Sequence, residues 1–244
     1  MKDVIFELVN KRQLTSDTYE LILRGDTTDI TAPGQFVNIE IEGLYLRRPI
    51  SVCDVEGDKL TLIVKVVGEG TERLCGYEIG RKIKVLSGLG NGFDINKCGK
   101  NNVLVGGGVG TPPMYMVAKK LIEKGVYPKV VLGFADKESV IYKEEFEKLG
   151  LSVIIATVDG SYGVKGFVTD ALKTLPETDY IYTCGPEPML KALHGVFSEN
   201  GQFSFEERMG CGFGACMGCS CKTKYGNKRI CKDGPILFAE EIVW

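Results

Sequence analysis

Five cysteines lie close together near the C-terminal end of the sequence. Cys211, Cys216 and Cys219 are spaced C-x4-C-x2-C, and Cys231 follows with eleven residues between it and Cys219. Thiolate sulfur is the usual ligand of iron–sulfur clusters and of structural zinc. The first three cysteines match the plant-type [2Fe–2S] spacing, whereas structural zinc is usually held by two short C-x2–4-C pairs. The spacing therefore favours a [2Fe–2S] cluster over zinc.

The fifth cysteine, Cys221, is a second candidate for the third ligand because it lies only two positions after Cys219. The two-residue interval after Cys216 favours Cys219. Glycines at four positions would let the loop wrap a cluster with its amides directed at the sulfurs: Gly210, Gly212, Gly214 and Gly218. The segment between Cys221 and Cys231 predicts a hairpin turning at Gly226-Asn227. Its basic residues, Lys222, Lys224, Lys228 and Arg229, could form a docking rim or simply a solvated face.

The residues before this tail fall into two regions that would position a redox centre. Residues 1–98 show short apolar segments between glycine-rich corners, which is typical of an antiparallel β-barrel or sandwich. The strands expected there are Val4–Val9, Thr18–Leu23, Gln35–Ile41, Leu60–Val67 and Lys82–Leu86. Residues 99–200 alternate between strands and helices, which predicts a parallel α/β sheet with helices on both faces. The expected domains are thus 1–98, 99–200 and a cluster-binding tail, 201–244.

Two turns in the α/β region follow predicted strands. GGGVGTPP, Gly106 to Pro113, joins a strand to a helix, where backbone amides can hold a pyrophosphate. It is not a G-x-G-x-x-G fingerprint, because Thr111 stands in the place of the third glycine and is expected to cap the helix. CGPEPML, Cys184 to Leu190, follows the strand YIYT. Ligands bind at the carboxyl ends of parallel strands, so both turns are candidate nucleotide contacts.

Three further motifs lie in the first region. LRRPISV, Leu46 to Val52, places Arg48 as a fork for phosphate on an extended segment, and a bend or bulge is expected to bring Ser51 to the same side. Gly68-Glu69-Gly70-Thr71 leads from a strand into a short helix and predicts a second phosphate-binding turn. GLGNGFDI follows at Gly88–Ile95.

The order of these motifs, R-P-I-S, G-x-G-T, GNGF, GGGVGTPP and CGPEPM, resembles the ferredoxin–NADP reductase superfamily. The cysteine tail makes the chain similar to the electron-transfer subunits of class 1B dihydroorotate dehydrogenases. The resemblance implies FAD in the barrel, a nicotinamide nucleotide in the α/β region, and Cys211, Cys216, Cys219 and Cys231 as cluster ligands. It also implies a partner subunit that carries FMN and oxidises dihydroorotate, in a heterotetramer with two copies of each subunit. Electrons would pass from FMN through the cluster and FAD to NAD⁺ in pyrimidine (UMP) biosynthesis.

By the same resemblance, residues can be assigned to each nucleotide. The FAD contacts would be Arg48, Pro49, Ile50, Ser51, Ile63, Val64, Lys65, Gly70 and Thr71, with Arg48 and Thr71 at the pyrophosphate. The nicotinamide-nucleotide contacts would be Gly108, Gly110, Thr111, Cys184, Gly185, Pro186 and Glu187. Asp136 and Asp159 follow predicted strands and would suit ribose hydroxyls, which favours NADH over NADPH and adds Asp159 to the site; both could equally be turn residues. Trp244 receives no role at the flavin.

Composition limits the remaining function classes. The net charge of −2 offers no field for nucleic acid, and no segment approaches the roughly 18 apolar residues of a membrane span. The charged N-terminal segment does not resemble a signal peptide, and nine cysteines, an odd number, argue against a disulfide framework, so a cytoplasmic location is expected. The alternatives are the flavin–iron-sulfur subunit of a transhydrogenase, hydrogenase or sulfite reductase, and a non-enzymatic nucleotide-binding module with structural zinc.

Overall fold

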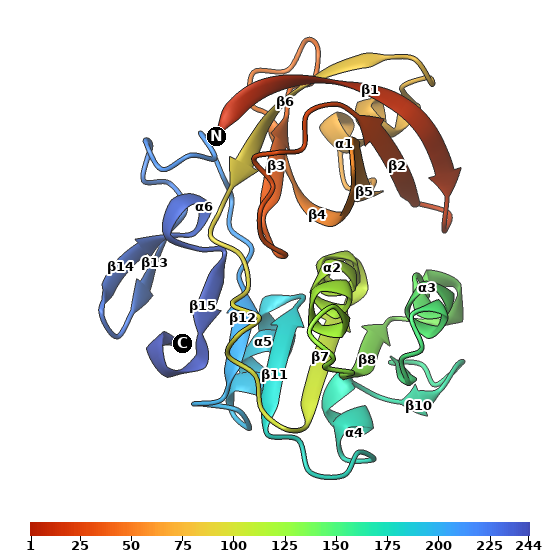
Figure 1. The fold of residues 1–244 in the computed structure, drawn as a ribbon, viewed down its shortest axis with the longest axis vertical. Coiled ribbons are helices and arrows are strands. Elements are labelled where there is room, and N and C mark those ends of the chain that lie inside the picture. The colour runs from red at the N-terminus through yellow and green to blue at the C-terminus, as the bar shows by residue number, and fades with distance from the viewer.

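The computed structural model describes all residues from 1 to 244. A β-barrel lies at one end of the molecule and an α/β unit at the other, with the C-terminal segment beside both (Figure 1). No helix is long and apolar enough to cross a membrane.

The first region is a closed antiparallel barrel with the strand order β1-β2-β5-β4-β3-β6. Its strands are β1 (Lys2–Gln13), β2 (Thr18–Arg24), β3 (Phe36–Ile39), β4 (Arg48–Glu56), β5 (Lys59–Lys65) and β6 (Lys82–Leu89). Side-chain alternation gives each strand an inner and an outer face. Along β6, Ile83 and Val85 are buried inside the barrel while Lys82 and Lys84 face solvent. The barrel prediction is confirmed, with β4 as a full strand where an extended segment was expected. The expected short helix is α1 (Glu69–Gly76).

The second region contains a seven-stranded sheet with the order β10-β9-β8-β7-β11-β12-β15. The strands are β7 (Asn102–Gly107), β8 (Lys129–Phe134), β9 (Val153–Thr157), β10 (Val164–Lys165), β11 (Tyr180–Cys184), β12 (Gly201–Ser204) and β15 (Ile236–Phe238). All pairs are parallel except β12 with β15. The last two strands come from the cysteine-rich part of the chain, so that segment continues the sheet instead of forming a separate layer.

Helices cover both faces of this sheet, as the alternation predicted. The helices are α2 (Thr111–Ile122), α3 (Lys143–Lys148), α4 (Val168–Leu172) and α5 (Glu187–His194), with one-turn segments η1 (Gly108–Gly110), η2 (Lys137–Ser139) and η3 (Ala239–Glu241). Apolar residues of α2 and α3 share one core with the sheet, and those of α4 and α5 share the other. The α2 side faces the barrel (Figure 1).

The barrel and the α/β unit are joined along α2. Met116 of α2 packs into the barrel core, and Ile63 of the barrel packs into the α2 core. Lys119 Nζ contacts Asp54 Oδ2 at 2.6 Å and Glu56 Oε1 at 2.9 Å, both on β4. Packing and paired charges therefore hold the two units together.

The C-terminal segment contains the hairpin of β13 (Ser220–Thr223) and β14 (Gly226–Arg229), followed by α6 (Ile230–Asp233). The hairpin prediction is confirmed, but the position of its turn was wrong. Thr223 pairs with Gly226, so the two loop residues are 224 and 225, and the Thr223 hydroxyl donates to the Gly226 carbonyl at 2.7 Å. This side chain–backbone bond moves the turn ahead of the glycine.

Candidate cofactor and cluster sites

Arg48 and the start of α1 form a cradle at one edge of the barrel. A Cβ added to Gly70 would lie 2.2 Å from Arg48 Nε, so the guanidinium rests directly on this glycine. Gly70 and Thr71 are buried in the first turn of the helix. Exposed amides at a helix start and a guanidinium fork are both suited to phosphate.

A threonine hydroxyl closes the turn of this cradle, and the strand that carries Arg48 differs from the sequence-based expectation. The Thr71 hydroxyl accepts from Val67 N at 2.9 Å and donates to the Gly68 carbonyl at 2.9 Å, so it closes the turn and leaves the backbone to face a phosphate. The β4 bulge lies between Val52 and Asp54, after Ser51, while pairing with β3 is regular from Arg48 to Ser51. The expected bend between Arg48 and Ser51 was therefore wrong.

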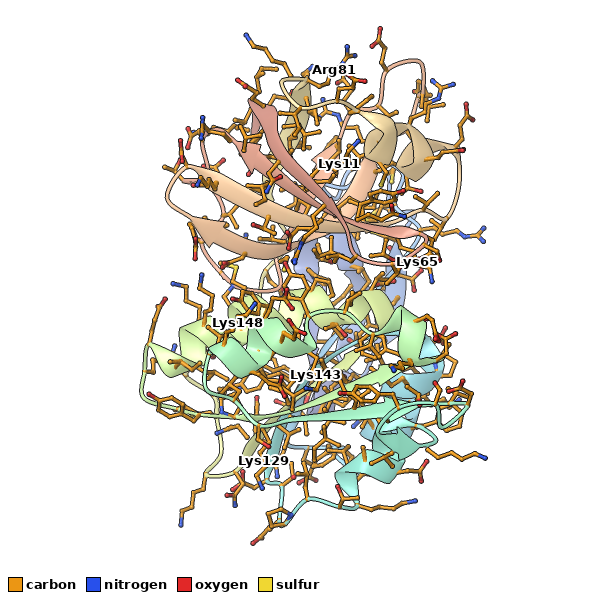
Figure 2. The ribbon with its side chains drawn as sticks, turned by 90° about the vertical axis from the view of Figure 1, so that its right-hand side faces the viewer. Lys11, Lys65, Arg81, Lys129, Lys143 and Lys148 are labelled. Atoms are coloured by element: carbon orange, nitrogen blue, oxygen red, sulfur yellow. The ribbon has the colours of Figure 1, made fainter.

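The other barrel residues assigned to FAD lie on adjoining strands. Pro49, Ile50 and Ser51 are half-buried on β4. On β5, Val64 packs inside the barrel and Ile63 against the α/β unit, whereas Lys65 is exposed. Figure 2 shows Lys65 at the barrel edge that faces the α/β unit. Alternation thus directs Ile63 and Lys65 toward the α/β unit and Val64 into the barrel.

A cavity of about 610 Å³ lies between the barrel and the carboxyl ends of the parallel strands. Gly108, Pro186 and Lys65, all assigned to a nucleotide above, line it. The remaining lining includes residues that the sequence reasoning missed: Gly133 and Phe134 at the end of β8, Ala135 after it, Val158 after β9, and Met189 of α5. The strand-end rule could have found Ala135 and Val158, because they lie at the carboxyl ends of β8 and β9.

Several assigned residues lie behind this cavity. A Cβ on Gly110 would lie 2.2 Å from the Cys184 carbonyl oxygen, so GGGVG packs directly on the CGPEPML turn. Thr111 is fully buried as the first residue of α2, and its hydroxyl has no partner, so the expectation that it caps the helix was wrong. The Cys184 thiol is also buried, which raises its pKa to about 12.

The remaining assigned residues lie at the turns around the cavity. Gly185 packs against Met189, and Glu187 begins α5 exposed to solvent. Asp159 and Asp136 each bond their own turn: Asp159 Oδ1 accepts from Ser161 N at 2.9 Å, and Asp136 Oδ1 from Ser139 N at 2.9 Å. The Ser161 bonds lower the pKa of the exposed Asp159 carboxyl, which stays ionised.

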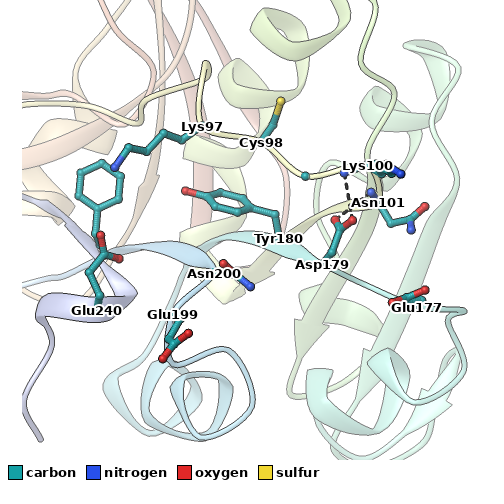
Figure 3. A pocket seen from close by; sticks show the side chains of 12 residues that line it. Lys97, Cys98, Lys100, Asn101, Glu177, Asp179, Tyr180, Glu199, Asn200 and Glu240 are labelled. Atoms are coloured by element: carbon teal, nitrogen blue, oxygen red, sulfur yellow. Dashed lines mark hydrogen bonds between the residues drawn. The ribbon is translucent and has the colours of Figure 1, made fainter.

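A second cavity, about 880 Å³, lies at the opposite ends of the strands. Figure 3 shows Asp179 accepting from the backbone amides of Lys100 and Asn101, at 3.0 and 2.9 Å. Its lining is polar and open, and it contains none of the residues assigned to a nucleotide. The cavity at the carboxyl ends is therefore the better candidate for a nicotinamide nucleotide.

The four cysteines assigned as ligands form two neighbouring pairs. The amides of Ala215 and Cys216 donate to Cys211 Sγ at 3.3 and 3.4 Å, and Cys231 N donates to Cys219 Sγ at 3.4 Å. No group of three or more His, Cys, Asp or Glu side chains is arranged to hold a metal ion. Amides directed at sulfur are the donor pattern that stabilises thiolates.

The electrostatics of these thiols differ from one pair to the other. Burial opposes ionisation of Cys211, but amides of Cys216, Phe213 and Ala215 lower its pKa to about 6. Burial, together with the neighbouring Cys219, raises the pKa of Cys231 to about 12. A bound cation would supply the positive charge that a buried second thiolate requires. The donor set of four thiols with amides directed at sulfur therefore fits a cluster with thiolate ligands, although the side chains stand as two separate pairs and not as one group.

Two of the basic residues of the hairpin form hydrogen bonds or ion pairs within the C-terminal segment. Arg229 Nη1 donates to the Gly214 carbonyl at 3.0 Å and its Nε pairs with Asp233 at 3.0 Å, while Lys228 pairs with Glu241. Cys221, on β13, is half-buried with a raised pKa caused by burial. Trp244 packs on Phe205 with tilted rings, at a centroid distance of 5.5 Å, and edge-to-face against His194 at 6.0 Å.

Comparison with known proteins identifies the relatives of this chain. A family model described as the iron–sulfur cluster binding domain of dihydroorotate dehydrogenase B matches residues 206–243, and the oxidoreductase NAD-binding domain matches residues 104–195. The "dihydroorotate dehydrogenase B (NAD(+)), electron transfer subunit" of Shouchella clausii is 42% identical over 97% of this chain and 96% of the relative. That of Bacillus pumilus is 43% identical over 99% and 98%.

Solved structures agree with this relationship. An NADH-dependent reduced ferredoxin-NADP oxidoreductase superimposes with a TM-score of 0.89 and 32% identity, covering 98% of this chain and 90% of that one. The Amycolatopsis cytochrome P450 reductase GcoB shares the fold at a TM-score of 0.70 and 21% identity, covering 80% of this chain and 65% of that one. The full-length similarity to curated relatives is decisive: the chain belongs to the family of electron transfer subunits of dihydroorotate dehydrogenase B (NAD(+)).

Proposed function

We propose that this chain carries electrons between a dihydroorotate-oxidising subunit and NAD⁺, using FAD and a [2Fe–2S] cluster, in pyrimidine biosynthesis. The observation that carries the proposal is the set of four cysteines, with amides directed at sulfur and with Cys211 bound to the barrel through Asn38. In the overall reaction, dihydroorotate and NAD⁺ become orotate, NADH and a proton, with two electrons transferred. The dihydroorotate chemistry belongs to a partner subunit that carries FMN.

The barrel is proposed to hold FAD along β4 and α1. Arg48 and the amides of Gly70 and Thr71 would bind the pyrophosphate, and Pro49, Ile50 and Ser51 would lie along the flavin. The β5 residues Ile63, Val64 and Lys65 would contact it through the adjoining strand. When bound, FAD supplies the exchange between hydride transfer and single-electron transfer that links NAD(H) to a cluster.

The strand-end cavity is proposed to hold NAD(H). Gly108 and Pro186 line it directly, while Gly110, Thr111, Cys184 and Gly185 shape the turns behind it. Glu187 stands between the lining residues Pro186 and Pro188, and Asp159 follows the lining residue Val158 and would offer an ionised carboxylate to ribose hydroxyls. Bound there, a nucleotide would lie between these turns and the barrel residues Thr15, Asp17 and Lys65, which line the opposite side of the cavity.

The cluster ligands are proposed to be Cys211, Cys216, Cys219 and Cys231, with Cys221 outside the set. Amides directed at Cys211 and Cys219 stabilise their thiolates. A cluster with four thiolate ligands requires cysteines kept reduced, which supports a cytoplasmic location. An assembly with two copies of each subunit is part of the same proposal, as are the domain limits 1–98, 99–200 and 201–244.

A visible spectrum and a reconstitution test this function. The purified chain should show flavin bands together with broad iron–sulfur absorbance, and a colourless protein containing zinc would refute the proposal. Mixed with the FMN-containing subunit, it should give NAD⁺ reduction that depends on dihydroorotate.

A transhydrogenase-type role is the second candidate, because a structure at 32% identity is an NADH-dependent reduced ferredoxin-NADP oxidoreductase. Co-purification with a ferredoxin- or NADP-linked partner, without dihydroorotate-dependent activity, would favour that role.

A further inference from the structure

Asn38 of the barrel makes a direct polar contact with the first cluster cysteine. Its side chain is on β3 and only 2% exposed, and its Nδ2 donates to the Cys211 carbonyl at 3.2 Å. Its Oδ1 is buried without a hydrogen-bond partner. A buried amide that leaves one polar atom unsatisfied lowers stability relative to an apolar residue of similar size. Stability alone therefore does not explain an asparagine at this position.

The cluster loop is shaped to accept this side chain. Gly212, next to Cys211, has a φ of +79°, and a Cβ added there would lie 2.4 Å from Asn38 Nδ2. Only glycine allows both this backbone conformation and the close approach. The GCG sequence at 210–212 thus brings the backbone of a ligand cysteine against the barrel wall.

A second asparagine holds the segment after the last cluster cysteine. Asn91 N donates to the Gly234 carbonyl at 2.7 Å, its Nδ2 donates to the Ile236 carbonyl at 2.8 Å, and its Oδ1 accepts from Ile236 N at 3.0 Å. This segment follows α6, which contains Cys231. The GNGF motif, which the nucleotide sites leave unexplained, therefore binds the chain behind the fourth ligand.

Both asparagines come from the part of the barrel adjoining the flavin strand. β3 pairs with β4, placing Asn38 opposite Pro49, and it also pairs with β6, which ends just before Asn91. We propose that Asn38 and Asn91 are positioning residues that fix the cluster relative to the flavin for electron transfer between them. This inference rests on the proposed function. It assigns the spacing of the two redox groups to the barrel, since each end of the cysteine set is bound to it.

The test separates hydride transfer from electron transfer to the cluster. The full chain, loaded with FAD and cluster, is mixed anaerobically with NADH in a stopped-flow instrument, and flavin and cluster absorbance are followed separately. Asn38→Asp removes the donor at constant size, Asn38→Ala removes the amide, and Asn91→Ala removes the second contact. Asn200→Ala, an exposed asparagine on the far side of the sheet, is the control.

In a catalytic site, a displacement near 1 Å can reduce a rate by up to about 100-fold, and electron transfer also slows as two redox groups move apart. We expect cluster reduction to slow at least about tenfold in Asn38→Asp and Asn91→Ala, while flavin reduction stays within about twofold of the wild type. Iron content and the EPR intensity of the reduced cluster should remain those of the wild type. Asn38→Gln, which keeps a donor, should recover part of the lost rate.

Three results would overturn the proposal: unchanged cluster reduction, equal slowing of flavin and cluster reduction, or loss of iron from both Asn38→Asp and Asn38→Ala. The last would make Asn38 a residue for cluster assembly. A wild-type chain without flavin and iron absorbance would instead refute the proposed function, so the two failures are distinguishable.

Discussion

Lys119→Met should remove the ion pairs that join α2 to the barrel. Lys119 is the cation that contacts Asp54, a buried residue. Removing Lys119 leaves the Asp54 carboxylate buried without a cationic partner. Breaking a fully buried pair costs about 3–5 kcal/mol. The Lys119 and Asp54 side chains retain 22% and 12% exposure, and Glu56 is mostly exposed, so we expect a loss of about 2–3 kcal/mol.

Thermal denaturation of the loaded protein measures this loss. For a chain of this size, about 2–3 kcal/mol corresponds to a Tm decrease of roughly 4–12 °C. Lys120→Met is the matched control, because the neighbouring lysine pairs only with Glu123 on the helix surface and should cost less than about 0.5 kcal/mol. Asp54→Asn combined with Lys119→Met should recover more than half of the loss, since no buried charge remains.

The pH dependence of the variant gives a second check. Burial raises the pKa of Asp54 above its ordinary 3.8 even though Lys119 lowers it, so removing Lys119 raises the pKa further. A carboxyl whose pKa is higher in the folded than in the unfolded state stabilises the folded state at low pH, where it is protonated. That stabilisation is lost as the pH rises through the folded-state pKa. The loss of unfolding free energy caused by Lys119→Met should therefore be smaller at acid pH. A deficit equal to that of Lys120→Met, or one that grows at acid pH, would contradict the reasoning.

Three further predictions concern the cofactor sites. Gly70→Ala should displace the Arg48 guanidinium and weaken FAD retention at least about tenfold in ultrafiltration, whereas Gly68→Ala, which meets no atom within 4 Å, should retain flavin. Cys231→Ser should lose the cluster by iron and sulfide analysis while Cys221→Ser keeps it; the reverse would replace the proposed ligand set. Gly107→Val, whose Cβ would lie 2.6 Å from Met189 Sδ, should raise the KM for NADH about tenfold at unchanged flavin content. An unchanged KM would contradict the placement of the nucleotide in this cavity.

Local sequence patterns determined the elements of this protein. Alternation along β6 and the strand–helix periodicity of residues 99–200 predict the barrel and the parallel sheet, because burial of one face or one stripe is a local property of the sequence. The spacing of Cys211, Cys216 and Cys219 likewise predicts a metal loop, since ligand intervals are set by short-range geometry.

Tertiary structure decided how these parts meet. The hydroxyls of Thr71 and Thr223 form bonds within their turns that residue type alone does not reveal, and the β4 bulge falls after Ser51 because of pairing with β5. The contact of Asn38 with Cys211 joins residues 173 positions apart. Long-range contacts of this kind depend on how strands pair and pack, which no local pattern encodes. The sequence therefore specified which groups could carry electrons, and the fold set their positions relative to one another.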